Sequence, residues 1–123
     1  MFRGCGSLQS VPLFDTGAVE DMSFMFSGCF SLQSVPALVV SSVTSFTDMF
    51  AACVSLGSAP LSGAVNDISF ASAKLSRDEL VAIFSALGTA AKTITIKSNW
   101  GVPSLTADDK KIATDKGWTI VEA

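Results

Sequence analysis

The chain has 123 residues, of which 49% are apolar and 15% are charged, so it allows one domain and leaves little room for two. A net charge of −3 and a pI near 4.6 argue against a nucleic-acid-binding surface, which is normally basic. The chain holds no histidine and no tyrosine, which excludes catalysis and metal binding by histidine and acid catalysis by tyrosine. We therefore expect a protein that is not an enzyme and that carries no cofactor and no metal.

The charged side chains are distributed unevenly along the chain. Residues 1–66 hold five of them and residues 67–123 hold the other fourteen. A first half rich in Ser, Thr, Gln and Ala either faces other protein or presents a neutral, solvated surface. The mean hydropathy is +0.50, yet no apolar run approaches the roughly 18 residues of a membrane helix, so we expect no membrane insertion.

The first half contains a sequence repeat with a period of 24 residues. The segment MFRGC at 1–5 recurs as MFSGC at 25–29 and as MFAAC at 49–53. The pattern Leu8-x-x-Val11-x-Leu13 returns after each shift and fits the strand pattern of leucine-rich repeats, whose period is about 20 to 29 residues. Its copies are Leu32-x-x-Val35-x-Ala37 and Leu56-x-x-Ala59-x-Leu61. We therefore expect a short strand with inward-facing apolar residues in each repeat.

Stacking of such repeats brings equal positions together, so the repeated apolar residues are expected to form ladders in a shared core. These expected ladders are Met1, Met25 and Met49; Cys5, Cys29 and Cys53; Leu8, Leu32 and Leu56; and the phenylalanines Phe2, Phe26 and Phe50, with Phe24 and Phe46. The cysteines leave three alternatives: a ladder of thiols, one disulfide with a thiol left over, or a three-thiolate metal site. Repetition itself explains their shared position and favours the thiol ladder.

A second apolar spacing precedes each Met-Phe pair, at Val19-x-x-Met22 and Val43-x-x-Phe46. It fits a second short strand or a helical turn, and both alternatives stay open. From Val65 the pattern lengthens, and Val65-x-x-Ile68-x-Phe70 predicts another strand.

The second half predicts two helices and two further strands. Ser76 and Glu79 form a capping box ahead of a helix whose buried face carries Leu80, Ile83, Phe84 and Leu87, and Gly88 ends it. A strand at 93–97, a loop at 99–103, a helix at 106–116 capped by Thr106 and ended by Gly117, and a strand at 118–121 follow. Because Ile68, Ile94 and Ile120 are spaced by 26 residues, we expect longer coils that continue the stack.

Asp108 and Asp109 are adjacent carboxylates at the start of the second predicted helix. A paired carboxylate site is one interpretation, but the first turn of a helix favours acidic residues through the helix dipole, so we expect the structural role.

The fold class predicted by these patterns is an α/β repeat solenoid, in the form of a right-handed parallel β-solenoid of the leucine-rich-repeat type. Residues 1–64 are expected to hold three 24-residue repeats. Residues 65–123 are expected to form longer strand–helix coils that cap the array.

The repeat resembles the BspA-type leucine-rich repeats found in bacterial surface proteins and in some phage structural proteins. The resemblance is carried by Met-Phe-x-x-Cys-x-Ser-Leu-x-Ser-Val and departs from the pattern at Ala51, Ala52 and Gly57. Residues 92–96 and 112–121 look like the C-terminal cap of such arrays in phage tail and fibre proteins. The resemblance implies a structural or adhesion role in a phage tail or fibre, with a location in the virion; the alternative is a bacterial surface adhesin that binds a host protein or glycan.

A candidate binding face lies on the polar positions of the predicted strands, together with one aromatic residue in the 99–103 loop. These residues are Gln9, Ser10, Gln33, Ser34, Ser58 and Trp100. No signal peptide is visible, because Met1 falls inside a repeat. We expect the first repeat to dock on another copy of the chain, on a neighbouring structural chain or on an upstream repeat, within a homo-oligomeric extracellular or virion assembly.

Overall fold

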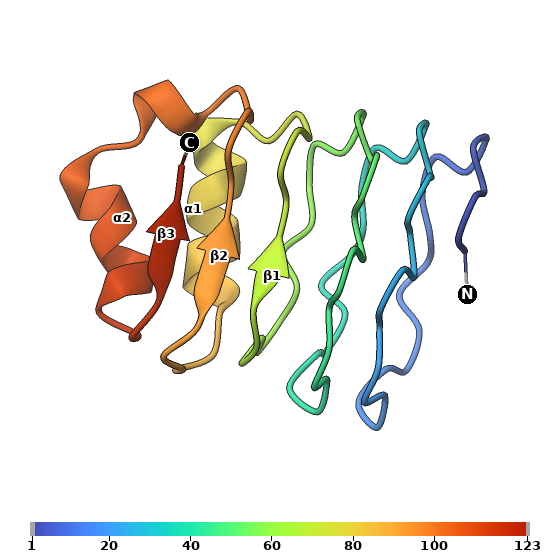
Figure 1. Cartoon of the computed structure of the whole chain (residues 1–123), viewed down its shortest axis with the longest axis horizontal. Coiled ribbons are helices and arrows are strands. Elements are labelled where there is room, and N and C mark those ends of the chain that lie inside the picture. Colours follow the sequence, from blue (N-terminus) through green and yellow to red (C-terminus); the bar gives the residue numbers. More distant parts are fainter. Residues whose placement is uncertain (1, 123) are drawn as a thin grey trace.

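In the computed structural model, which describes residues 2–122, the chain winds through successive coils that lie side by side (Figure 1). The last coils carry a parallel three-stranded sheet in the order β1-β2-β3. The sheet is covered on one side by helices α1 and α2, with the short 3-10 helix η1 between them in sequence (Figure 1). The element bounds are β1 (Ile68–Ser69), α1 (Arg77–Ala86), β2 (Thr93–Thr95), η1 (Val102–Ser104), α2 (Ala107–Thr114) and β3 (Thr119–Val121).

The prediction of a strand in each of the first three repeats is wrong. Residues 2–66 contain isolated parallel bridges instead, which join Ser10 to Ser34 and Ser34 to Ser58 in one row. A second row contains a bridge between Asp21 and Ser45. A proline follows two residues after each serine of the first row, and it removes the N–H that would extend the pairing.

The residues of the second apolar spacing flank the bridged pair Asp21 and Ser45, and each bridge is followed directly by a turn. Met22, Val43 and Phe46 are buried there, and the chain then turns through residues 23–28 and 47–52. Two left-handed backbone positions recur in these turns with the 24-residue period. They are Gly4, Gly28 and Ala52 in one set, and Phe24, Asp48 and Ser72 in the other. The turns therefore reverse the chain in the same way in successive coils.

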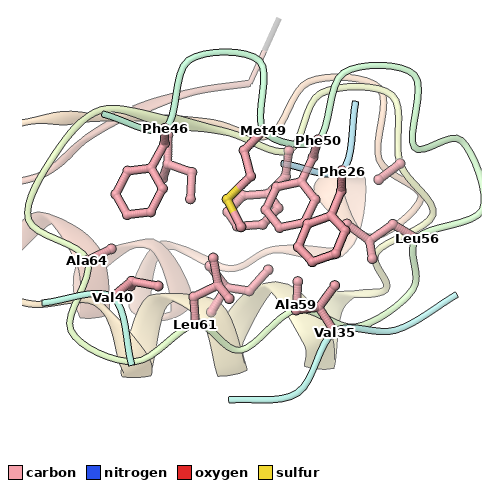
Figure 2. Packing of buried hydrophobic residues seen from close by; sticks show 14 of the residues in the cluster. Phe26, Val35, Val40, Phe46, Met49, Phe50, Leu56, Ala59, Leu61 and Ala64 are labelled. Atoms are coloured by element: carbon pink, nitrogen blue, oxygen red, sulfur yellow. The ribbon is translucent and has the colours of Figure 1, made fainter. Parts of the chain in front are cut away.

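The core is a continuous stack of aromatic rings lined by aliphatic side chains. The rings of Phe2 and Phe26 are stacked with centroids 5.5 Å apart, and those of Phe26 and Phe50 lie 5.7 Å apart. Phe70 continues the stack on Phe50 at 5.1 Å. Figure 2 shows Phe46, Met49 and Phe50 facing Val40, Leu61 and Ala59 across the core. No single coil could enclose these side chains, so burial depends on the neighbouring coils.

Most of the expected ladder residues are enclosed. Leu32 and Leu56 are fully buried, Leu8 is partly buried against the core, and Met25 and Met49 are buried. Met1 lies outside the described residues.

Four residues of the predicted core lie elsewhere. Leu13 exposes 69% of its surface, and Ala37 is also exposed. In the second repeat the inward position is occupied by Leu38, the residue that follows Ala37, and Leu38 is fully buried. Cys5 is exposed on the first coil. Phe24 lies outside the ring stack, at a left-handed turn, where the Arg3 guanidinium sits 4.7 Å from its ring centroid.

The sheet confirms the expected register of the longer coils. Ile68 pairs with Ile94, and Ile94 pairs with Ile120, so the spacing of 26 residues corresponds to one step across the sheet. The strands are shorter than predicted, because β2 ends at Thr95 and β3 begins at Thr119.

Helix α1 begins after Ser76, whose hydroxyl accepts the N–H of Glu79 at 3.4 Å and so confirms the predicted N-cap. The predicted capping box is only half formed, because the Glu79 carboxylate accepts no hydrogen bond from the Ser76 N–H. Gly88 does not have the left-handed conformation expected of a terminal glycine. A Cβ at this position would lie 2.7 Å from Val65 Cγ1, so close packing explains the glycine. Helix α2 ends at Thr114, short of the predicted residue 116, and Gly117 follows with a φ of +96°.

Candidate functional site

The predicted polar face forms one edge of the stack of coils. Backbone N–H groups of Gln33 and Gly57 donate to the carbonyls of Gln9 and Gln33 at 2.9 and 2.8 Å, which sets these residues side by side. The bridged serines described above follow directly in sequence. Gln9, Ser10 and Gln33 are exposed, whereas Ser34 and Ser58 are half-buried. The structure therefore brings five of the six predicted residues together on one edge.

Trp100 lies at the far end of the same edge. The N–H of Lys74 donates to the carbonyl of Leu56, and the N–H of Gly101 donates to that of Leu75, so the loop follows the third repeat. Trp100 exposes 70% of its surface, and the Lys74 ammonium lies 5.4 Å from its ring centroid. Along the edge, Gly57 and Lys74 lie between Trp100 and Gln33. A ligand that touches both Trp100 and the glutamines must therefore extend along the edge.

This edge offers neutral hydrogen-bonding groups, one aromatic surface and one ammonium group. Amides and hydroxyls donate and accept hydrogen bonds without a charge, and an exposed indole stacks on flat or apolar ligand surfaces. The edge thus fits recognition of neutral polar groups.

Two of the three cysteines act as hydrogen-bond donors inside the core. The thiol of Cys29 donates to the carbonyl of Phe2 at 2.9 Å, and that of Cys53 donates to the carbonyl of Phe26 at 3.0 Å. Burial raises the pKa of the Cys29 thiol, and burial together with Cys29 raises the pKa of Cys53 to about 12. Both therefore stay protonated at neutral pH. The three cysteines are free thiols in this structure, of which only Cys5 is exposed.

The adjacent carboxylates Asp108 and Asp109 have separate environments. Asp108 is exposed, whereas Asp109 is buried and accepts the N–H of Thr106 at 2.9 Å in a capping box. Asp109 also receives the Arg77 guanidinium through two hydrogen bonds, at 2.9 and 2.7 Å. These bonds from Arg77, followed by that from Thr106, lower the pKa of Asp109, and the hydrogen bond to Asp109 raises the pKa of Arg77. The carboxylate of Asp109 thus ties α2 to the start of α1, in addition to its place in the first turn.

Two positioning side chains were not predicted. Asn99 is buried; its amide nitrogen donates to the carbonyls of Phe70 and Ile96, and its amide oxygen accepts the N–H of Leu75. Asn99 falls one 26-residue period after the buried Ala73, and a polar residue at an apolar period position is the signal that could have identified it.

Lys116 is the second such side chain. Its ammonium group donates to the carbonyls of Phe84, Ser85 and Leu87 at 2.8 to 2.9 Å, which caps the C-terminus of α1 from the next coil. No periodic signal marks this residue, since the bond spans about 30 residues between two helices.

Two further features concern metals and membranes. Across residues 2–122, no group of three or more Cys, Asp or Glu side chains is arranged to hold a metal ion. Neither of the described helices has the length and apolar composition that would carry it across a bilayer.

Residues 2–122 thus form coils that lie side by side and end in a three-stranded parallel sheet accompanied by two helices (Figure 1). The chain belongs to the family described as "Mycoplasma protein of unknown function, DUF285", which matches residues 1–69. The match covers the three sequence repeats and ends at β1. No curated protein and no solved structure matches the chain.

Proposed function

We propose that this chain is a non-enzymatic structural and adhesion module of a phage tail or fibre, which mediates assembly or binding to a host surface. The observation that carries the proposal is the polar edge that runs from Gln9 to Trp100 over the stacked coils, with one ammonium group, that of Lys74, beside Trp100. A rigid row of amides and hydroxyls suits a repetitive polar partner such as a glycan or a protein surface. The resemblance of the repeats and of residues 92–121 to phage tail proteins supports the location in a virion.

The fold class is part of this proposal. We take the stacked coils to be a right-handed parallel solenoid of the leucine-rich-repeat type, with residues 65–123 as its cap. Parallel bridges at 24-residue spacing and the parallel sheet β1-β2-β3 support this assignment.

Assembly is proposed to use the first repeat. The first coil is the outermost one at its end of the stack, and it carries Phe2, Leu8 and Phe14 in partly buried positions (Figure 1). A second copy that covers these residues gives a homo-oligomer, whereas a neighbouring structural chain in the same place gives a mixed assembly. Light scattering of the purified chain at low and high concentration tests this, and a monomer throughout that range contradicts it.

The alternative is a bacterial surface adhesin, and the family description, which names Mycoplasma, is the observation that favours it. Immunogold electron microscopy with an antibody against the chain distinguishes the two. Label on the tails of purified phage particles supports the virion proposal, whereas label on the surface of intact cells selects the adhesin. Label confined to the cell interior contradicts both.

Binding by the polar edge is tested with fluorescently labelled chain on intact host cells. Replacing Trp100 by Ala, or Gln33 by Ala, is expected to reduce the bound label. The matched control is Leu13→Ala, because Leu13 is equally exposed but is not a residue of the polar edge. Equal loss in all three variants, or loss in none, argues against recognition by this edge.

A further inference from the structure

An apolar hollow lies on the first coil, at the N-terminal end of the stack (Figure 1). It has a volume of about 180 Å³, and all of its described lining residues fall within 14–25. The apolar lining includes Phe14, Val19, Met22 and Met25. A cavity of about 150 Å³ is enough to hold benzene, so the hollow has room for one large apolar side chain.

In the second coil the corresponding position is closed. The residues that follow this apolar lining by 24 positions are all buried, namely Leu38, Val43, Phe46 and Met49. Residues 22–25 of the first coil lie alongside them, and Met22 exposes only 2% of its surface. By the 24-residue repeat, the hollow is therefore the place where a further coil would put the side chain that Met22 puts against the second coil.

Backbone hydrogen bonds show the same difference between the two coils. The N–H of Met22 donates to the carbonyl of Ser45 at 3.0 Å, and that of Phe24 makes the next such bond at 2.8 Å, two residues along. These bonds belong to the backbone ladder that joins successive coils. The corresponding carbonyls of the first coil are those of Asp21 and Ser23, and no donor within residues 2–122 reaches either of them. Two free acceptors thus flank the hollow, in the arrangement that holds the neighbour of the second coil.

The charge around the hollow is negative. Asp21 lines it, and Asp15 and Glu20 are exposed neighbours of lining residues. The corresponding residues of the second coil are uncharged, namely Val39, Thr44 and Ser45. Arg3 is the one basic residue before Lys74 in the sequence, and its guanidinium lies 4.7 Å from the ring centroid of Phe24, which does not line the hollow. A partner with basic groups is therefore favoured over an acidic one.

We infer that the hollow binds an apolar side chain of a neighbouring protein chain, carried on a segment with basic residues beside it. The segment takes the place that residues 22–24 have on the second coil. Its apolar side chain fills the hollow, and its N–H groups donate to the carbonyls of Asp21 and Ser23. Because the bridge between Asp21 and Ser45 sets equal positions of adjacent coils side by side, basic residues just before the apolar one face Glu20 and Asp21.

A second copy of the chain is a poorer occupant of this place. Its own first coil carries the same carboxylates, and like charges at facing positions are unfavourable. Its opposite end is covered by α2, so no coil is left open there (Figure 1). The inference rests on the proposed use of the first repeat in assembly, and it selects a neighbouring chain as the partner.

The test uses a blocked peptide with the sequence of residues 17–28 and the changes Glu20→Lys and Asp21→Lys. This probe keeps the segment that packs on the second coil and replaces its two carboxylates by ammonium groups. NMR of the chain with labelled methionine methyl groups is expected to show shifts at Met22 and Met25, which line the hollow, and none at Met49, which is enclosed in the next coil. Absence of binding, or shifts that leave Met22 and Met25 unchanged, overturns the inference.

Two comparison peptides separate the contributions of charge and of the apolar side chain. The unchanged peptide of residues 17–28 is expected to bind about tenfold more weakly than the probe, because it puts like charges beside Glu20 and Asp21. A probe that also carries Met22→Ser is expected to lose binding, because nothing fills the hollow. Equal or stronger binding of the unchanged peptide selects a second copy as the occupant and overturns the basic partner. Equal binding of the serine peptide overturns the role of the hollow.

A matched pair of variants of the chain tests the carboxylates. Glu20→Gln with Asp21→Asn is expected to weaken binding of the probe about tenfold. Asparagine at position 21 can still accept the N–H of Ser23, which the Asp21 carboxylate accepts at 2.8 Å. The control, Asp108→Asn with Asp115→Asn, changes the net charge equally at exposed positions at the two ends of α2. An equal loss in both variants indicates non-specific charge attraction and overturns the site.

Failure of this inference is distinguishable from failure of the proposed function. A chain that stays monomeric in light scattering and binds the probe at the hollow contradicts the homo-oligomer and supports the neighbouring chain as partner. A chain that forms oligomers whose contact shifts Met22 and Met25, and that does not bind the probe, keeps the homo-oligomer and overturns the inference.

Discussion

At the scale of single residues, the core depends on side chains that are enclosed from both sides by neighbouring coils. Leu32 is fully buried and stands between the coils that hold Leu8 and Leu56. Replacing Leu32 by Ala is expected to lower the free energy of unfolding by about 2 to 5 kcal/mol, measured by urea denaturation. Leu13→Ala is the control, since Leu13 is 69% exposed and should change stability very little. A loss for Leu32→Ala as small as the loss for Leu13→Ala would contradict burial.

Backbone conformation gives a second prediction at this scale. Ala52 has a φ of 60°, at the turn position where the first two repeats have Gly4 and Gly28. A left-handed conformation costs a residue with a side chain about 1 to 2 kcal/mol, so Ala52→Gly is expected to stabilise the chain by about 1 kcal/mol. Gly28→Ala should destabilise by a similar amount, because its φ is 77°. Opposite signs in thermal unfolding confirm the shared turn, and a destabilising Ala52→Gly argues against it.

The buried thiols predict the response to alkaline pH. Because the pKa of Cys53 is raised to about 12 in the folded chain, its thiol ionises first in the unfolded chain, near the ordinary cysteine value of about 8.5. The stability gained by burying the neutral thiol is therefore complete below pH 8.5 and falls as the pH rises toward 12. Under reducing conditions, the stability difference between the wild type and Cys53→Ala should shrink over this range. A difference that stays constant from pH 8 to pH 11 would count against a protonated buried thiol.

At the scale of elements, α1 and α2 are joined by one carboxylate. Asp109 accepts the Arg77 guanidinium and closes the capping box of α2, and its pKa is lowered by these bonds. Its contribution to stability is present above the pKa of the unfolded chain, about 4, and is lost as the pH falls below it. Asp109→Ala should therefore cost more stability at pH 7 than at pH 3, by urea unfolding. Asp108→Ala is the control at the neighbouring exposed residue, and an equal pH dependence there would refute the assignment.

The elements also show which parts of the fold are predictable from sequence. Both helices were predicted because their caps, Ser76 and Thr106, act within a few residues of the positions that they satisfy. The register of β1, β2 and β3 follows from a spacing that any observer can count. The strands of the first repeats were over-predicted, because alternation of apolar residues does not distinguish a strand from a single bridge followed by a turn.

The candidate site was predictable to a similar extent. The polar edge follows from the period alone, since equal positions of stacked coils must meet. The bond from Arg77 to Asp109 and the cap that Lys116 supplies to α1 were not predictable. Each joins residues on different coils without a repeat partner, so it depends on how the longer coils pack.

At the scale of the whole molecule, the turn of residues 46–52 and the segment of residues 67–72 meet at a boundary that two side chains span: the Phe70 ring, and the Asn66 amide, which donates to the carbonyl of Val43. Phe70 exposes 1% of its surface and stacks on Phe50 across this boundary, where the N–H groups of Phe46, Asp48, Phe50 and Ala52 make no hydrogen bond within residues 2–122, unlike their counterparts one repeat earlier. In a stack of repeats, stability is a sum of the coils and their interfaces, so weakening one interface uncouples the two sides. Phe70→Ala is expected to lower the free energy of unfolding by about 3 to 5 kcal/mol. The variant is also expected to unfold in two steps, with the low-charge N-terminal side first. Hydrogen exchange measured in increasing urea checks this.

Phe26→Ala is the matched control for this last prediction. Phe26 is also fully buried and stacks on Phe50 at 5.7 Å, but the ladder over it is intact, with its own N–H bonded to Met49 at 2.9 Å. It should lose a similar amount of stability, because the same ring is removed from the same stack. Its exchange profile should not divide at this boundary, since the interface between residues 46–52 and 67–72 is unchanged. If both variants unfold in a single step, the two sides are coupled by contacts other than Phe70, and this boundary is not the weakest interface of the stack.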